Sequence, residues 1–467
     1  MGQRRTRHWV WMSWVVLGAA VPLACSGDPG RRTALGEGGE GGGAGSPTAS
    51  GGSSILPGGG KGGSGGMPSS GGANDPVGGG DAGATTLPGG GTGNDRGGAP
   101  PEVMAGAAGA GGAGIVTAPV LPGCEGTLTF PDSYVEQQIL MALGKDNGPV
   151  TQEDVAGLTE LEIPFNDANI TITGLECLTN VQILHFSDGA VGYPLEVLNK
   201  MPNLVSVDYS NGYLSDETLV QFKVLTGIVS LDLGRNFISD LTPLASLTQL
   251  RHLALSNIGN FNQTPVDITP LASLVNLRTL DLSHDELIDG APLAALTKLQ
   301  QLSLESSKLP SLDVVSGLTN LTTLDIGQTG LTALPDLSKL TKLTALSIAY
   351  DELASFAAVS ALTRLTALNV SSTKLTDLSV LSPLTQLQTL DVTYNDYGDA
   401  TVLGALPNLT TLDTSFCTIT SLQPLVDSAY IGPGDSVTAD LADCDTHKAA
   451  LQALVDKGVN VSSFCLQ

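Results

Sequence analysis

The sequence predicts that its last three quarters form an α/β solenoid: a horseshoe with a parallel concave sheet, short helical or extended return segments, and helical N- and C-terminal caps. The main observation is an apolar pattern that recurs about twelve times between residues 158 and 430, mostly at an interval of 22 residues. Helix-like patterns flank this array on both sides. All Phe and Tyr residues lie after residue 123, so only this part can build a core that contains aromatic rings.

Residues 1–24 have the pattern of a signal peptide. A basic start with Arg4, Arg5 and Arg7 precedes the apolar stretch Trp9–Ala24. Its 16 residues are fewer than the ~20 that a bilayer span needs. The segment therefore predicts export of the chain. An uncleaved membrane anchor is the alternative.

Cys25 follows the small residue Ala24, and this junction resembles the lipobox of bacterial lipoproteins. Pro22 stands where that motif usually has Leu. The resemblance implies that a lipid is attached to Cys25 and anchors the chain to a membrane, whereas plain cleavage and release is the alternative. Ser26, in a place where Asp favours the inner membrane, points to the outer membrane.

Residues 25–123 contain the lipidation candidate and a glycine-rich stretch without aromatic residues. Such a composition cannot bury enough apolar surface to offset the entropy lost on ordering. We therefore expect a disordered tether that holds the folded part away from the lipid surface. Residues 124–157 are then an N-terminal cap, residues 158–430 the repeats, and residues 431–467 a C-terminal cap.

The repeating unit is L-x-x-L-x-L-x-x-N, as in Ile228, Leu231, Leu233 and Asn236. The alternating apolar residues should point inward from a short strand. No unit can bury its own apolar face, so the units must stack on one another. One interval of 27 residues is explained by an insertion at Ile258–Pro265, which should bulge from the rim.

This pattern resembles leucine-rich-repeat proteins, in particular the internalin-like type with 22-residue repeats. The return segment Leu241-Thr-Pro243-Leu244 has the form typical of that type. The resemblance covers residues 128–467 and implies a ladder of Asn side chains at the ninth position. Because several repeats carry another residue there, we expect a weaker ladder. The replacements are Asp285, Asp351, Ser307, Thr329, Thr373 and Cys417.

Both caps should contain a helix. Phe130–Leu143 follows a helical apolar pattern with a capping box that starts at Ser133, and a second box starts at Thr151. Thr446–Lys457 predicts the C-terminal helix, and Gly458 should end it. A strand after this glycine should complete the last coil.

The cysteines after residue 123 are read through the same resemblance. Similar C-terminal caps carry a disulfide, which implies a Cys444–Cys465 bond, and Cys124 and Cys177 could likewise join the N-terminal cap to the first repeats. Cys417 is then a buried free thiol. A zinc site is the alternative, although no C-x-x-C occurs.

Several functions are disfavoured. The net charge of −25 argues against nucleic-acid binding. The repeats contain no G-x-S-x-G, H-E-x-x-H or nucleotide-binding motif, and their His residues fall in separate units. We therefore expect no enzyme and no cofactor.

Two columns of the repeat are candidates for binding. The fifth position should point outward from the strand, and its carboxylates should form an acidic concave face that attracts cationic partners. Neighbouring carboxylates could share Ca²⁺, or could simply be solvated. The eighth position carries aromatic residues late in the array, as binding anchors or as ordinary rim packing. The candidates are Asp232, Asp281, Asp325, Asp391 and Asp413 in the fifth position and Tyr350, Tyr394 and Phe416 in the eighth.

These features predict a monomeric lipoprotein at the cell surface or outer membrane. Its repeat array should bind a protein, or a glycan, outside the cell in an adhesion-like role. The alternative is a structural or spacer protein of the envelope without a specific ligand.

Overall fold

The computed structural model describes residues 121–164, 170–187, 195–259 and 265–467. All of them belong to one compact unit of the chain. The predicted signal peptide, Cys25 and the predicted tether up to residue 120 lie outside the described residues, and so does most of the insertion at Ile258–Pro265. No helix in the described ranges has both the length and the apolar character that crossing a bilayer requires.

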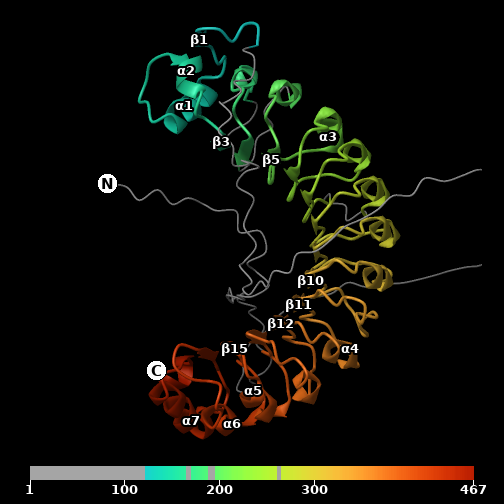
Figure 1. The fold of residues 1–467 in the computed structure, drawn as a ribbon, viewed down its shortest axis with the longest axis vertical. Coiled ribbons are helices and arrows are strands. Elements are labelled where there is room, and N and C mark those ends of the chain that lie inside the picture. The colour runs from blue at the N-terminus through green and yellow to red at the C-terminus, as the bar shows by residue number, and fades with distance from the viewer. Residues whose placement is uncertain (1–120, 165–169, 188–194, 260–264) are drawn as a thin grey trace, which may run out of the picture. The chain divides into compact units, whose positions relative to one another are not determined.

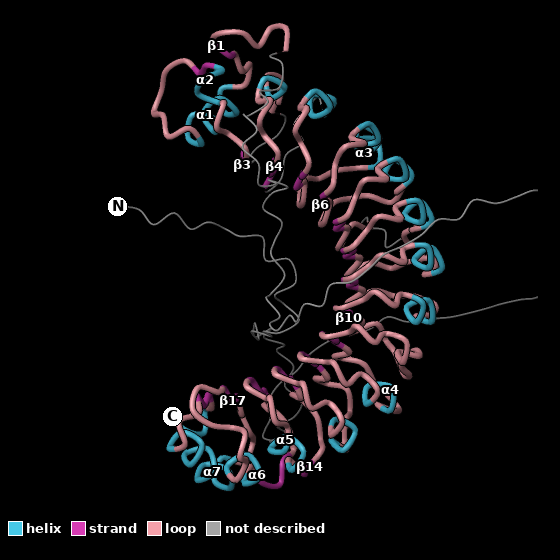
Figure 2. Tube along the Cα trace, in the orientation of Figure 1, coloured by secondary structure: helices cyan, strands magenta, loops and turns pink. Residues whose placement is uncertain are grey.

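Fourteen short strands form one parallel sheet that follows the order of the chain. The same repeat position pairs from strand to strand, so that Leu324 lies opposite Leu302 and Leu346. Strands line the inner side of the curved stack and helices the outer side (Figures 1 and 2). The predicted α/β leucine-rich-repeat solenoid is confirmed. The strands are β3 (Glu160–Pro164), β4 (Ile183–Ser187), β5 (Ser206–Asp208), β6 (Ser230–Asp232), β7 (His252–Ala254), β8 (Thr279–Asp281), β9 (Gln301–Ser303), β10 (Thr323–Asp325), β11 (Ala345–Ser347), β12 (Ala367–Asn369), β13 (Thr389–Asp391), β15 (Thr411–Asp413), β17 (Ser436–Thr438) and β18 (Asn460–Ser462).

Most return segments contain a short helical turn on the outer side of the stack, whereas the segment between β10 and β11 has none. Pro243, Pro270 and Pro292 lie in the first turn of three of them, where a missing N–H costs no hydrogen bond. One Leu of each such turn is fully buried. The 3₁₀ turns are η1 (Leu175–Cys177), η2 (Leu195–Lys200), η3 (Val220–Val224), η4 (Thr242–Ser246), η5 (Thr269–Ser273), η6 (Ala291–Ala295), η7 (Asp313–Gly317) and η8 (Leu378–Leu381), and the α-helical turns are α3 (Asp216–Leu219), α4 (Ala357–Ser360), α5 (Thr401–Ala405) and α6 (Gln423–Val426).

The N-terminal cap contains the predicted helix, but the predicted capping box at Ser133 is wrong. Asp132 is the N-cap residue, and its carboxylate accepts the N–H groups of the first turn. The same carboxylate accepts the N–H of Thr171 at 3.1 Å, which ties the helix to the first repeats. The second predicted box, at Thr151, is present. The cap consists of β1 (Thr127–Leu128), α1 (Ser133–Ala142), β2 (Val150–Thr151) and α2 (Gln152–Val155).

The C-terminal helix begins two residues earlier than predicted, because the carboxylate of Asp443 caps it by accepting the N–H of Thr446. Gly458 has a φ of 91° directly after the helix and ends it as predicted. The sheet continues through this cap with β17 and β18. β18 is the strand predicted after Gly458, whereas β17 was not predicted. The remaining elements are α7 (Cys444–Asp456), η9 (Phe464–Leu466) and a small parallel pair, β14 (Gly398–Asp399) and β16 (Ile419–Ser421).

The ninth position forms a buried ladder between repeats. The side-chain oxygen of Asn236 accepts the N–H groups of Gly212 and Leu214 at 2.9 Å. Its amide group donates to the carbonyl oxygens of Tyr209 and Leu233 at 2.8 Å. One side chain thus satisfies donors and acceptors that the turn leaves open. Asn395 repeats this arrangement, whereas the shorter side chains of Ser307, Thr373 and Cys417 donate to the carbonyl oxygens of Leu282, Val370 and Val392.

Asp285 is the exception in this ladder. One of its carboxylate oxygens accepts the N–H groups of Ile258 and Gly259 at 3.0 and 3.2 Å. The other, Oδ2, is buried and has no hydrogen-bond partner, the one such side-chain atom in the part of the chain that the structure describes. Asp285 and Asn236 occupy the same position of the repeat, so Oδ2 stands where Asn236 has its amide nitrogen, which donates to two carbonyl oxygens. Burial raises the pKa of Asp285 to about 7. A proton on Oδ2 would supply the donor that the ladder needs.

One disulfide joins the N-terminal cap to the first repeats, and a second lies within the C-terminal cap. The structure contains the bonds Cys124–Cys177 and Cys444–Cys465, with Cα–Cα distances of 5.3 and 5.0 Å. Closing the second loop stabilises the fold by about 3 kcal/mol on the chain-entropy account. Cys417 is a buried free thiol.

Candidate binding surface

The turn after each strand places the eighth repeat position in a left-handed conformation. In the repeats from β5 to β15 this residue has a φ between 54 and 62°. Only Gly, Asn and Asp adopt such angles readily. We call this side of the sheet, where the strands end, the carboxyl-terminal rim. Its left-handed residues are Asn211, Arg235, Asn257, His284, Ser306, Gln328, Tyr350, Ser372, Tyr394 and Phe416.

The predicted acidic column lies at the strand ends and has a structural role. In the repeats that have one of these Asp residues, its carboxylate accepts the backbone N–H two residues later, as in the bond from Gly327 to Asp325 at 3.0 Å. A short polar side chain that bonds its own backbone in this way favours a turn directly after the strand. The recurrence of Asp in this column is therefore explained by the turn. The same bond is made by Asp232, Asp281, Asp391 and Asp413.

The charge of this column is weaker than the number of carboxylates suggests. Burial raises the pKa of Asp232 to about 7, and the nearby carboxylate of Asp208 raises it further. Burial likewise raises the pKa of Asp325 to about 7. It also raises the pKa of Asp391 and Asp413. The concave face thus carries less negative charge near neutral pH than its sequence implies.

The three aromatic candidates lie on the carboxyl-terminal rim with about half of each side chain in solvent. Tyr350, Tyr394 and Phe416 are 58%, 54% and 51% exposed. The rings of Tyr394 and Phe416 stack, with centroids 4.7 Å apart and planes 13° from parallel. Burial raises the pKa of Tyr350, and the charge of Asp391 raises it further. We call these three residues the aromatic cluster.

Other aromatic side chains of the same rim have different environments. Tyr397, which lies between Tyr394 and Phe416 in sequence, is buried and hydrogen-bonded to Thr414. Tyr213 is 62% exposed, has a φ of 55° and packs against Phe237 at a centroid distance of 5.8 Å. Sequence reasoning missed this second pair because Tyr213 lies two positions after the eighth.

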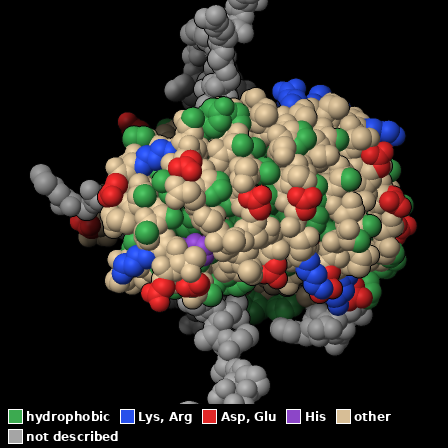
Figure 3. All heavy atoms as spheres, turned by 90° about the horizontal axis from the view of Figure 1, so that it is seen from below, with side chains coloured by type: hydrophobic (Ala, Val, Ile, Leu, Met, Phe, Trp, Pro, Cys, Tyr) green, Lys and Arg blue, Asp and Glu red, His purple; other side chains and the backbone are tan. Residues whose placement is uncertain are grey.

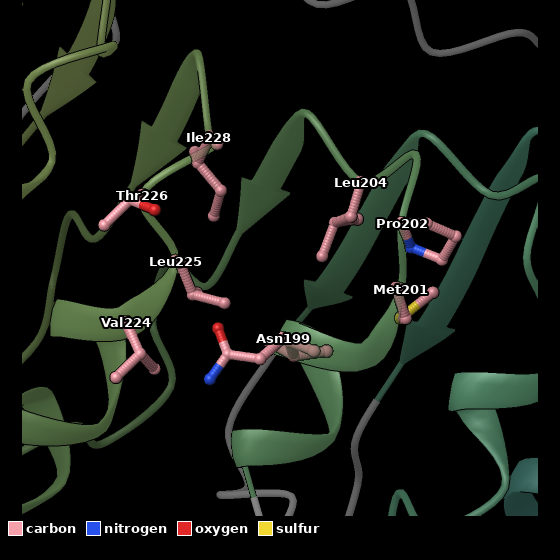
Figure 4. Close-up of a pocket in the computed structure, with 10 residues that line it drawn as sticks. Asn199, Met201, Pro202, Leu204, Val224, Leu225, Thr226 and Ile228 are labelled. Carbon is pink, nitrogen blue, oxygen red and sulfur yellow. The ribbon is translucent and has the colours of Figure 1, made fainter.

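A shallow pocket lies between two early repeats, where η2 and η3 lead into β5 and β6 (Figure 4). Its volume is about 200 Å³, and Met201, Leu204, Leu225 and Ile228 form much of its wall. The interval between these two repeats is 24 residues, two more than the common spacing. The pocket thus lies at a junction where the repeat spacing departs from the common one.

No group of three or more His, Cys, Asp or Glu side chains within the described ranges could hold a metal ion. The calcium hypothesis rests on pairs of strand-end carboxylates and stays a prediction. Figure 3 views the molecule from below, and on the face seen there acidic, basic and hydrophobic side chains are interspersed. With the carboxylates bonded to their own turns, the aromatic cluster is the most distinctive part of the predicted site.

Comparisons with known proteins place this geometry in a family. No sequence model of a protein family matches the chain, and no curated protein matches it either. An internalin (InlF) from Listeria monocytogenes is 30% identical over 67% of this chain and 96% of its own, with a TM-score of 0.55. A leucine-rich-repeat protein from Leptospira interrogans, 19% identical, covers 66% of this chain and 91% of its own with a TM-score of 0.51, and shares the fold. With its 14-stranded parallel sheet and 22-residue repeats, the chain belongs to the internalin-like leucine-rich-repeat proteins.

Proposed function

We propose that the chain is a lipid-anchored protein of the cell surface or outer membrane whose repeat array binds a protein partner through the aromatic cluster. The observation that carries the proposal is the placement of three half-exposed aromatic side chains in a left-handed turn position. Membership in a solenoid family supports it, because stacked repeats form extended concave binding surfaces.

The backbone conformation makes the aromatic cluster costly to the fold. A left-handed conformation costs a bulky residue roughly 1–2 kcal/mol relative to the ordinary helical region. Other repeats hold Asn or Ser at this position, such as Asn211, Asn257 and Ser372. The aromatic rings recover only part of this cost through packing, because about half of each remains in solvent. A partner that covers them would bury the remaining area.

The arrangement suits a protein partner. Tyr and Phe offer large, rigid surfaces at a low entropic cost, and exposed aromatic residues are frequent anchors of protein interfaces. Tyr350 lies two strands from Tyr394, which corresponds to about 10 Å at the usual strand spacing. The stacked pair and Tyr350 therefore lie on either side of the repeat that holds Ser372, so one partner can contact all three rings.

Surface presentation rests on the amino-terminal sequence. The predicted signal peptide, Cys25 and the glycine-rich tether form the arrangement expected of an anchored, exported domain. Replacement of Cys25 by Ala should move the protein from the membrane fraction to the soluble fraction. Unchanged fractionation would contradict the lipid anchor. The chain is then released if both forms are soluble, and held by an uncleaved signal segment if both stay with the membrane.

Affinity capture with the full chain tests the binding proposal. The triple variant Tyr350→Ala, Tyr394→Ala, Phe416→Ala should lose a saturable protein partner that the natural chain retains. Tyr213→Ala is the matched control, because Tyr213 shares the left-handed backbone and the exposure but lies outside the cluster. Equal loss in both variants, or the absence of any saturable partner, would favour the spacer role instead.

A further inference from the structure

The side of the sheet where the strands begin differs in charge from the rest of the repeat domain. We call it the amino-terminal rim and define it as the five residues centred on the first apolar position of each repeat. From Val181 to Leu409 the eleven segments of this rim contain no Asp or Glu, although the whole chain has a net charge of −25. They do contain five cationic side chains: Arg251, Arg278, Lys298, Lys342 and Arg364.

These five cations make no ion pair with a carboxylate of the described residues. Four of them are exposed, and Arg251 is half-buried. On the opposite rim, in contrast, Lys308 and Lys374 lie 3.5 and 2.7 Å from Glu286 and Glu352. The amino-terminal rim therefore keeps its positive charge, whereas the carboxyl-terminal rim neutralises part of its own.

Neutral partners hold two of these ammonium groups in place. Lys298 donates to the side-chain oxygen of Asn276 at 2.7 Å, and Lys342 donates to that of Asn320 at 2.6 Å. The amide of Asn320 in turn donates to the carbonyl of Thr297 at 2.8 Å. Each lysine is thus oriented by the preceding repeat without loss of charge.

The cations form a row along the sheet, beside β7, β8, β9, β11 and β12, with none beside β10. The backbone N–H of Arg278 donates to the carbonyl of Arg251 at 2.8 Å, which makes these two arginines direct neighbours. Their positive charges lower the pKa of His252 beyond the effect of its burial. The row continues to Arg364, which precedes β12, and so spans about 24 Å at the usual strand spacing of ~4.8 Å.

The remaining side chains of this rim are small, polar or aliphatic. Thr, Asn and Gln alternate with the cations, and no segment contains an aromatic residue. Single-stranded nucleic acid is usually held by aromatic stacking as well as charge. An anionic membrane would be repelled by the carboxylates of the surrounding domain, because a flat surface approaches many of them at once. A thin, hydroxyl-rich polyanion can contact the rim alone.

We propose that the amino-terminal rim binds a linear acidic polysaccharide, with the row from Arg251 to Arg364 pairing with its carboxylate or sulfate groups. The Gln side chains between the cations, and the Thr hydroxyl oxygens as acceptors, supply hydrogen bonds to hydroxyl groups, while Asn276 and Asn320 hold the lysines. This site lies on the opposite rim from the aromatic cluster and does not depend on the proposed protein partner. Because its contacts are exposed ion pairs, binding weakens as salt rises.

Binding of the full chain to polygalacturonate and to dextran sulfate, with uncharged dextran as the reference, tests this proposal. The variant R278Q/K298Q/K342Q/R364Q should bind both polyanions at least about tenfold more weakly, a loss of about 1.4 kcal/mol. The matched control K200Q/K308Q/K339Q/K374Q removes the same charge from exposed lysines elsewhere and should bind nearly as the natural chain does. The aromatic-cluster variant should also keep its polysaccharide binding.

Equal weakening in both quadruple variants would overturn the proposal, because it would reduce the effect to net charge. Saturable binding only to polyglutamate or to vesicles with anionic lipid would also overturn it, as would the absence of binding to either polysaccharide. Thermal unfolding of each variant shows whether the fold is intact. Since all eight substituted side chains are exposed, we expect every variant to fold.

Discussion

The two rims of the sheet are built from the same repeats, but they differ in how much their side chains stabilise the fold. On the carboxyl-terminal rim nearly every position stabilises the turn. Asp325 and its equivalents close it, the next residues adopt left-handed angles, and Asn236 or its substitutes form the ladder. On the amino-terminal rim several Asn and Thr side chains donate to backbone carbonyls, but the side chains of the five cations bond no backbone group of the described residues. Function on the first rim therefore competes with stability, whereas the cations of the second rim can bind a ligand without loss of a turn.

The largest expected effect concerns the ladder at Asp285, whose pKa is raised from 3.8 to about 7. The folded state keeps a proton that the unfolded chain loses above pH ~4. The stability that this proton contributes is complete at lower pH and is lost as the pH rises through 7. Asp285→Asn replaces the protonated oxygen by an amide. It should remove this pH-dependent loss of unfolding free energy, which is as much as about 4 kcal/mol.

Chemical denaturation between pH 4 and 8 measures this effect. The difference in unfolding free energy between Asp285→Asn and the natural chain should grow with pH and level off above 7. Asn236→Asp is the reciprocal control and should introduce the same pH dependence in a repeat that lacks it. A difference that is independent of pH would show that Asp285 is ionised in the fold throughout.

A smaller effect is expected when Tyr350 of the aromatic cluster is replaced: stability should rise, and binding of the protein partner should weaken. Tyr350→Asn places a residue that tolerates left-handed angles at a φ of 62° and should raise the unfolding free energy by roughly 1 kcal/mol. The same change should weaken capture of the protein partner. Tyr213→Asn should stabilise similarly and leave capture unchanged. A destabilised Tyr350→Asn variant would mean that the ring is needed for packing, as in the rim-packing alternative.

The repeat register could be read from the sequence because the apolar spacing of Leu302, Leu324 and Leu346 directly sets the strand pairing. The start of each cap helix could not. Asp132 and Ser133 are both competent N-caps, and the contact of Asp132 with Thr171, far along the chain, favours the first. β17 was missed because the 22-residue apolar pattern stops before Ser436, although the sheet continues.

The candidate site was foreseen only in part. The exposed aromatic cluster followed from its column, but the left-handed backbone beneath it did not, since Tyr, Gln and Arg are not residues that signal such angles. The turn-closing role of Asp391 and Asp413 was also missed, because a carboxylate that bonds its own backbone looks the same in sequence as one that awaits a ligand. The row of cations from Arg251 to Arg364 could have been predicted from the sequence, because it lies in the residues around the first apolar position.

The smallest expected effect is on the stability of the amino-terminal rim variant. Arg278 and Arg364 have no carboxylate partner in the described residues, and the bonds from Lys298 and Lys342 go to neutral amides. Their replacement by Gln should change the unfolding free energy by less than about 0.5 kcal/mol in each case. Thermal and chemical unfolding measure this directly.

Asn320→Ala, which removes the bond to the Thr297 carbonyl, should lower the unfolding free energy more than any of the four changes, because it leaves a backbone acceptor without its donor. If instead the cation changes destabilise the fold by more than about 1 kcal/mol, well above the range of ordinary surface substitutions, the row stabilises the fold after all, and the contrast between the two rims fails.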